Sequence, residues 1–282
     1  MRSFLFMVSA MVLLMFSCKG NTSTADVEET AVADSSDSCS IDTVPVDTME
    51  QLISATPMPK TADELFDDFF FNFAANRSLQ LERIKFPLPV IEAGLTKHIE
   101  KGDWHMEHFF MRQGYYTLIF DNVKQMALVK DTSVEHVVVE KVFFKEKTVK
   151  QYVFERKAGK WMLCSIQFNP LYENMNASFL KFYQRFSCDS AFQIASLHDP
   201  VRFTGPDPDD DFSQIEGIIT ADTWPAFASE LPTEMIYNII YGQTYTESNH
   251  KIFVIRGISN GLEVELTFEN EGGKWALTEL AT

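Results

Sequence analysis

Two histidines close together in the chain are the first candidates for chemistry. His105 and His108 are three positions apart and flank Glu107. On a helix the two imidazoles would share a face, as paired metal ligands must. The sequence offers no second His or Cys pair with ligand spacing. We therefore interpret them as surface histidines and expect neither a metal nor a cofactor.

An acidic run and three thiols are the other groups that could bind an ion or cross-link the chain. The run Asp207-Pro208-Asp209-Asp210-Asp211 could offer oxygens to calcium, but it lacks the Gly and the terminal Glu of a calcium loop. A solvated loop is the favoured interpretation. Cys39 lies near the N-terminus, whereas Cys164 and Cys188 fall in a predicted strand and at a helix end. Single buried thiols are common there, so we favour free thiols over a Cys164–Cys188 bridge.

Absent motifs and the overall charge further limit the classes of function that the protein could have. A Gly-rich phosphate loop, a Gly-x-Ser-x-Gly elbow and a paired-carboxylate motif are all absent from the sequence. The 282 residues include 24 Lys or Arg and 40 Asp or Glu, a net charge of −16. A surface this acidic repels phosphate backbones, which argues against nucleic-acid binding. We name no catalytic residue on these grounds.

The first 17 residues have the pattern of an export signal. Arg2 precedes an uncharged run from Phe4 to Phe16, which as a helix spans about 20 Å and is too short for a hydrocarbon core of about 30 Å. The segment Met15–Cys18 resembles a bacterial lipobox, although its first two residues depart from the usual pattern. The resemblance implies cleavage before Cys18, lipidation of its sulfur and anchoring in the outer membrane of the cell envelope, facing the periplasm or the cell surface. A plain secretory signal is the alternative.

Residues 18–60 are predicted to form a disordered tether. Ten Ser or Thr and eight acids lie within residues 21–50, without an aromatic residue. Such a segment buries too little apolar surface to offset the entropy of ordering it. The triplets Asp42-Thr43-Val44 and Asp47-Thr48-Met49 resemble an O-glycosylation acceptor of Bacteroidetes. That resemblance implies sugars on Thr43 and Thr48.

A repeat divides the remaining chain into residues 61–172 and 173–282. The pattern Phe-Glu-x-x-x-Gly-Lys-Trp-x-Leu at 154–163 recurs at 268–277, 114 positions later. The upstream landmarks Phe69, Phe73, Gln80 and Pro87 recur 113 positions later as Phe182, Phe186, Gln193 and Pro200, and Trp104 recurs as Trp224. Because the order is the same in both halves, we predict two copies of one domain of ordinary size.

Each half opens with aromatic residues at helical spacing. Thr61 and Glu64 have the spacing of a capping box. Behind them Phe66, Phe69, Phe70 and Phe73 share one face, and Phe179, Phe182, Tyr183 and Phe186 repeat the pattern. Second short helices are predicted at about 78–84 and 190–197, and the following prolines end them and begin an extended piece.

The rest of each half is predicted to be strands. Segments rich in β-branched and aromatic residues lie at 115–120, 134–144, 149–157 and 161–168 in the first half, and at 234–241, 251–258, 261–270 and 275–280 in the second. Gly159 and Gly273 precede the last strand of each half, where a short hairpin loop requires positive φ.

Helices followed by a four-stranded antiparallel meander with a Gly-Lys-Trp turn resemble the nuclear-transport-factor-two-like superfamily. The fold class so implied is α+β, with two repeated domains, each a cone of N-terminal helices packed on a curved antiparallel sheet. A cystatin-like fold is the alternative. A lipoprotein with tandem copies also resembles Bacteroidetes families of unknown function.

The resemblance suggests two functions. We expect an envelope-anchored, non-enzymatic module that binds a small molecule, a glycan or an envelope protein, or that forms a homo-oligomer. Some members of the superfamily place acid and base side chains inside the cone, which makes a small-molecule isomerase or hydratase the alternative. Tyr115, Tyr116 and Asp121 are the residues that could line a polar pocket, although a strand Tyr more often packs its ring.

Mass spectrometry of protein purified from its native host tests the N-terminal predictions. The mature chain should begin at Cys18 and carry acyl groups on it, with added sugar mass on peptides containing Thr43 or Thr48. An unmodified N-terminus, or one at another residue, would contradict the lipid anchor, and unmodified peptides would contradict glycosylation.

Overall fold

The computed structural model describes residues 58–243, 245 and 248–282. Cys18, Cys39, Thr43 and Thr48 lie outside the described residues, as do the signal segment and the tether up to residue 57. Within those ranges, no helix combines the length and apolar character needed to span a bilayer.

The described residues form short helices and twelve strands. The α-helices are α2 (Phe66–Ala75), α3 (Arg77–Arg83), α4 (Val123–Met126), α5 (Ala177–Cys188) and α6 (Ser190–Ala195), and the 3₁₀ turns used below are η1 (Lys60–Asp63), η3 (Phe109–Arg112), η5 (Leu171–Glu173) and η6 (Trp224–Ala226). The strands are β1 (Leu88–Glu92), β2 (Leu95–Ile99), β3 (Tyr115–Phe120), β4 (His136–Phe143), β5 (Thr148–Lys157), β6 (Lys160–Pro170), β7 (Leu197–Asp207), β8 (Asp210–Ile219), β9 (Met235–Ile240), β10 (His250–Gly257), β11 (Glu263–Glu271) and β12 (Lys274–Ala281).

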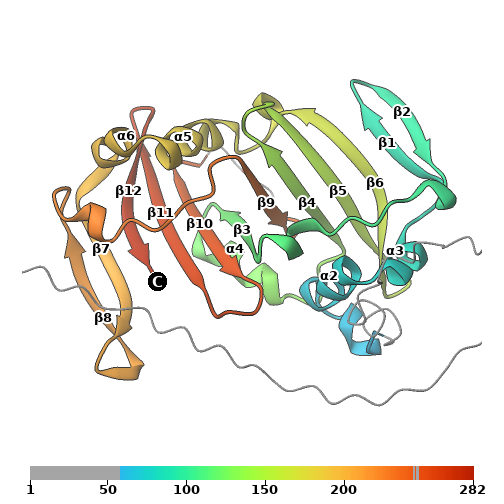
Figure 1. The fold of residues 1–282 in the computed structure, drawn as a ribbon, viewed down its shortest axis with the longest axis horizontal. Helices are drawn as coiled ribbons and strands as arrows, with labels where there is room; N and C mark the ends of the chain where they lie inside the picture. Colours follow the sequence, from blue (N-terminus) through green and yellow to red (C-terminus); the bar gives the residue numbers. More distant parts are fainter. Residues whose placement is uncertain (1–57, 244, 246–247) are drawn as a thin grey trace, which may run out of the picture. The chain divides into compact units, whose positions relative to one another are not determined.

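All twelve strands belong to one sheet. Its order is β2-β1-β6-β5-β4-β9-β3-β10-β11-β12-β7-β8, so the same strand pattern runs inward from both edges (Figure 1). The expected four-stranded meanders lacked the hairpins β1–β2 and β7–β8. β1 begins directly after Phe86-Pro87, whereas Asp199-Pro200 lies within β7. The mixed α+β class is confirmed.

Each of the two central strands of the sheet, β9 and β3, pairs with a strand from the other half of the chain. β3 comes from the first half but pairs with β10, and β9 comes from the second half but pairs with β4, both antiparallel. The two meet in a parallel bridge between Thr117 and Asn238, where the Thr117 hydroxyl donates to the Tyr237 carbonyl at 3.0 Å. Each of the predicted halves, 61–172 and 173–282, therefore pairs one of its strands with the other half, and their division into two domains stays a prediction.

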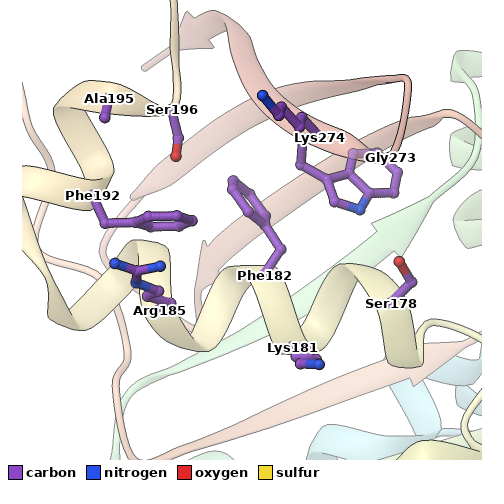
Figure 2. Close-up of a pocket in the computed structure, with 10 residues that line it drawn as sticks. Ser178, Lys181, Phe182, Arg185, Phe192, Ala195, Ser196, Gly273 and Lys274 are labelled. Carbon is purple, nitrogen blue, oxygen red and sulfur yellow. The ribbon is translucent and has the colours of Figure 1, made fainter.

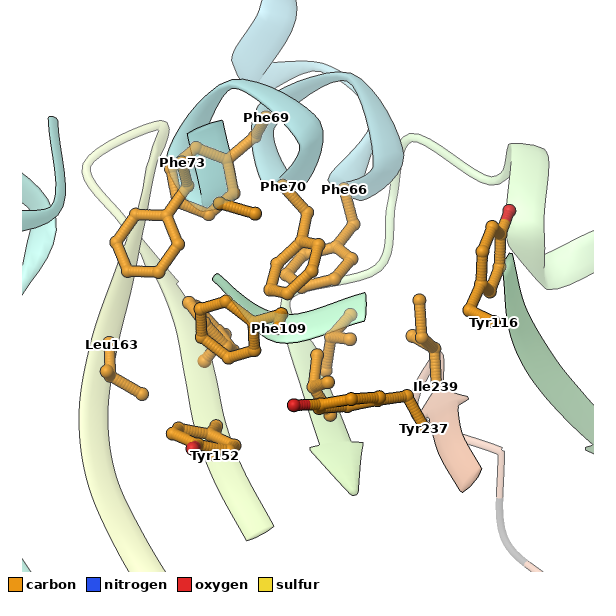
Figure 3. Packing of buried hydrophobic residues seen from close by; sticks show 14 of the residues in the cluster. Phe66, Phe69, Phe70, Phe73, Phe109, Tyr116, Tyr152, Leu163, Tyr237 and Ile239 are labelled. Atoms are coloured by element: carbon orange, nitrogen blue, oxygen red, sulfur yellow. The ribbon is translucent and has the colours of Figure 1, made fainter. Parts of the chain in front are cut away.

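Two aromatic cores lie on opposite faces of this sheet. Along β10, Ile252 and Val254 belong to the core under α2, whereas Phe253 and Ile255 belong to the core under α5. Successive strand residues point to opposite faces, so the two helical layers lie on opposite sides. In the first core the rings of α2 pack directly onto the sheet, and Phe70 lies 4.8 Å from Phe109 between ring centroids (Figure 3).

The same polar contact ties each helix pair to a tryptophan. The Trp104 indole donates to Gln80 Oε1 at 3.0 Å, and the Gln80 amide donates to the Phe73 carbonyl. In the second half Trp224 donates to Gln193 Oε1 at 2.9 Å, and Gln193 donates to the Phe186 carbonyl. Each side-chain amide, buried in Gln80 and partly buried in Gln193, thereby finds its partners and links consecutive helices.

The predicted capping box is wrong. Thr61 and Glu64 belong to a 3₁₀ turn, and α2 begins at Phe66 without a side-chain cap. Asp63 instead accepts hydrogen bonds from Arg83 Nη1 and Nη2 at 2.8 and 2.9 Å and from the Trp161 amide at 3.1 Å. A bidentate, charge-assisted contact of this kind outweighs a neutral helix cap.

Calorimetry tests whether the strand exchange makes the two halves one folding unit. The chain should unfold in a single transition, with equal calorimetric and van't Hoff enthalpies. A fragment of residues 58–172 should show no cooperative transition, because β4 would lose β9 and β3 would lose β10. Cooperative unfolding of that fragment alone would contradict the prediction.

Candidate functional site

A groove with an aromatic floor lies between α5, α6 and the turn that joins β11 to β12. Its volume is about 550 Å³, within the roughly 300–1,000 Å³ usual for ligand pockets. It is lined by Ser178, Lys181, Phe182, Arg185, Phe192, Ala195, Ser196, Gly273, Lys274 and Trp275. Figure 2 shows Phe182 rising from α5 between Phe192 and the Gly273–Lys274 turn.

Local structure fixes the walls of the groove. Asp189 caps α6 by accepting a hydrogen bond from the Phe192 amide at 2.9 Å, which sets the angle between α5 and α6. Gly272 and Gly273 both have positive φ, 58° and 84°, a conformation that side-chain-bearing residues rarely adopt. The Gly273 prediction is confirmed, and this tight turn presents Lys274 to the groove.

Three cations surround the aromatic floor. Lys181 and Arg185 come from α5, and Lys274 comes from the opposite wall. The Arg185 guanidinium lies over the Phe192 ring at 4.0 Å, a cation–π contact, and it also approaches Asp189 at 3.5 Å. An anionic group beside a flat apolar body has the chemistry that complements this arrangement.

A second, smaller pocket contains a buried carboxylate. Glu140 of β4 is 1% exposed and lines a pocket of about 260 Å³. Gln151 and Asn174 donate to its Oε1 at 2.9 and 2.7 Å, and Asn238 donates to its Oε2 at 3.0 Å. Burial raises the pKa of Glu140, against the lowering effect of these three amides.

The residues predicted to line one polar pocket point in three directions. Tyr115 and Tyr116 are consecutive on β3, so they face opposite sides of the sheet. Tyr115 lines a pocket beside β11. Tyr116 is buried near Asp67, and burial together with that carboxylate raises its pKa to about 12. Asp121 is buried in an ion pair with Lys251. These three residues do not form a common site.

The other candidates lie apart from the groove. His105 is exposed beside the Asp103 carbonyl, and His108 lines a pocket with Glu107. Among the described residues, no group of three or more His, Cys, Asp or Glu could hold a metal ion. Asp207 and Asp209 form the turn between β7 and β8. Cys164 and Cys188 are free thiols.

The groove and Glu140 were both missed at the level of sequence. The Gly-Lys-Trp pattern identified the repeat, and in the second half the turn at Gly273 and Lys274 forms one wall of the groove. Lys181 and Arg185 lie four apart on a helix, a spacing that signals a shared face. No local signal marked Glu140, because its partners come from β5, β9 and the segment after η5.

Comparison with known proteins places this architecture in a class. A crystal structure of an NTF2-like protein from Bacteroides fragilis NCTC 9343 is 41% identical in sequence and superposes with a TM-score of 0.74. The match covers 80% of this chain and 98% of that one, so the resemblance to nuclear-transport-factor-two-like proteins is confirmed. More particularly, residues 45–282 match the family described as "Domain of unknown function (DUF4348)", and the chain belongs to that family. No curated protein matches it.

Replacement of Glu140 tests the raised pKa. The native state retains the Glu140 proton above the ordinary value of 4.5, whereas the unfolded state loses it, so the contribution to the free energy of unfolding falls as pH rises through this window. In Glu140→Gln this decline should vanish, because the side-chain amide does not titrate. The variant can keep its hydrogen bonds, since Asn238 Oδ1, which has no partner among the described residues, can accept from the new amide after a flip. Urea unfolding at pH 4, 6 and 8 should show the variant gaining on wild type with pH.

Two variants serve as controls for this experiment. Glu140→Leu should be less stable than Glu140→Gln by about 3 kcal/mol at every pH, because it leaves three amide donors without their acceptor. Glu173→Gln removes an exposed carboxylate beside the same pocket and should stay near wild type. A pH-independent difference between Glu140→Gln and wild type would contradict the assignment.

Proposed function

We propose that this protein is an envelope-anchored, non-enzymatic binding module whose ligand occupies the groove between α5, α6 and the β11–β12 turn. The ligand class is an anion with a flat or apolar body. One observation carries the proposal: Lys181, Arg185 and Lys274 surround aromatic rings, of which those of Phe182 and Phe192 are only partly buried, in a chain with a net charge of −16.

Charge and apolar surface act together in this groove. A local cationic site on an acidic protein attracts anions only at short range, because salt screens charges beyond about 8 Å. The aromatic floor then supplies the apolar contact that holds the ligand. Selectivity follows from needing both, since a simple anion gains little from the rings and a neutral apolar molecule gains nothing from the cations.

Membrane attachment and duplication belong to the same proposal. The lipobox-like segment ending at Cys18 supports a lipid anchor, and the tether to residue 60 would give the folded part freedom to move. The mirrored strand order and the matching Gln80–Trp104 and Gln193–Trp224 contacts support a duplicated domain spanning 61–172 and 173–282. A homo-oligomer or an envelope protein remains among the proposed partners.

A small-molecule isomerase or hydratase is the second candidate. Glu140 favours it, because a buried carboxyl group with a raised pKa beside a pocket has the character of a general acid or base. Its two oxygens already accept three amide hydrogen bonds, and aromatic rings fill the space under α2 (Figure 3). Binding is therefore the function that the geometry supports better.

Charge reversal in the groove tests the binding function. The probe is 8-anilinonaphthalene-1-sulfonate, which joins an anion to aromatic rings and reports binding by fluorescence. Lys181→Glu/Lys274→Glu should weaken its affinity at least tenfold, about 1.4 kcal/mol, and added salt should weaken wild-type binding.

The control is Lys97→Glu/Lys124→Glu, an equal charge change at exposed sites outside the groove. Its affinity should stay within twofold of wild type. Equal affinities for the two double variants, or no saturable binding by the wild type, would overturn the proposal.

A further inference from the structure

The first half contains the counterpart of the groove, and there it is covered. By the 113- and 114-position shifts of the repeat, Phe69 and Trp161 correspond to Phe182 and Trp275. The 3₁₀ turn η1 lies against this surface, with Ala62 and Asp63 both buried. Its Asp63 carboxylate binds Arg83 of α3 and the Trp161 amide near the start of β6. The cover is a peptide segment held by a carboxylate.

Matched residues show that the second half lacks such a cover. Phe69 is 0% exposed, whereas Phe182 is only partly buried. Trp161 is 1% exposed and Trp275 is 8% exposed. The helices and turns that form the two surfaces have the same order, so the additional exposure of Phe182 and Trp275 marks the place where no segment of the second half covers the surface as η1 does in the first.

The segment before α5 is held elsewhere. The turn that corresponds to η1 in this segment is η5, and it comes directly after β6 in the chain. The Leu171 amide donates to the Lys147 carbonyl at 2.8 Å, and Asn174 donates to Glu140 at 2.7 Å. These contacts keep η5 at the edge of β4 and β5. The groove between α5, α6 and the β11–β12 turn is therefore left open by the path of the chain.

The open groove carries more positive charge than the covered surface, as the binding of an acidic peptide requires. Asp68 of α2 corresponds to Lys181, and Asn72 corresponds to Arg185. Burial alone would raise the pKa of Asp63, but the hydrogen bond and charge of Arg83 outweigh it and lower the pKa, so this carboxylate stays ionised in its contact. Where the covered surface has the single buried cation Arg83, the open groove has cations on both of its walls. Several cations can pair with more than one carboxylate.

We propose that the groove binds an acidic peptide segment of a partner protein, docked as η1 docks in the first half. The segment would place a small apolar residue on Phe182 and Trp275 and two or more carboxylates against Lys181, Arg185 and Lys274. This inference rests on the proposed function, since it names the occupant of the same groove. A short turn suffices, because η1 covers the matched surface with 4 residues.

Peptides derived from η1 provide the probe. The acidic peptide has the sequence of residues 59–65 with Lys60→Glu, Pro-Glu-Thr-Ala-Asp-Glu-Leu, and carries a fluorophore. The neutral peptide is Pro-Gln-Thr-Ala-Asn-Gln-Leu. Fluorescence polarisation with the full chain should show the acidic peptide binding at least tenfold more tightly than the neutral one, and unlabelled acidic peptide should displace 8-anilinonaphthalene-1-sulfonate.

The repeat supplies a matched pair of variants. Lys274→Glu should weaken peptide binding at least tenfold, whereas Lys160→Glu, at the matched exposed position of the covered surface, should change it less than twofold. Both substitutions lie on the surface, and circular dichroism confirms that each variant folds. Equal effects of the two variants would overturn the docking site.

The outcome also separates this inference from the proposed function. Dye binding that depends on Lys274, without binding of the acidic peptide, would overturn the peptide inference and leave the anion site standing. Binding of neither probe would overturn both. Equal binding of the acidic and neutral peptides would show that charge plays no part and would also reject the inference.

Discussion

The described structure depends on pairing at the centre of the sheet, where the two halves meet. Without β9 and β3, one edge of β4 and one edge of β10 would leave backbone N–H and C=O groups unpaired, and such edges must be paired or protected. β9 pairs with β4 and β3 pairs with β10, so each half is completed by a strand from the other. Because β3 and β9 are buried on both faces, they are apolar almost throughout.

The exchange also sets where the helices lie. The two central strands are parallel neighbours, and alternate residues of β10 feed opposite cores. β9 contributes Tyr237 and Ile239 to the core under α2, and Tyr241, the residue directly after β9, adds its ring. The Tyr241 hydroxyl donates to Asp67 of α2 at 2.5 Å. The helix of the first half is thereby held by a strand of the second, so the stability of the two halves is shared.

The segments that precede α2 and α5 take different paths, so the aromatic surfaces of the two similar halves differ in how they are covered. The turn η1 precedes α2 and covers the aromatic surface of the first half through the contact of Asp63 with Arg83. The segment before α5 must continue from β6, and Asn174 fixes it beside Glu140. One short connection therefore explains both the open groove and the amide-lined carboxylate, without any change in the order of helices and strands.

The sequence alone determined the elements whose signals are local. Aromatic spacing predicted α2 and α5, alternation and β-branched residues predicted eight strands, and Gly273 predicted a tight turn with positive φ. The hairpins β1–β2 and β7–β8 escaped because their strands are largely exposed and carry a weak apolar pattern. Only the tertiary structure decided that β3 and β9 exchange partners, that Thr61 and Glu64 form no capping box while Asp63 binds Arg83, and that Lys274 faces Lys181 and Arg185 across a groove. The reason is physical: strand pairing and side-chain convergence depend on residues far apart in the chain, and composition or periodicity within one segment carries no information about which distant edge it will meet.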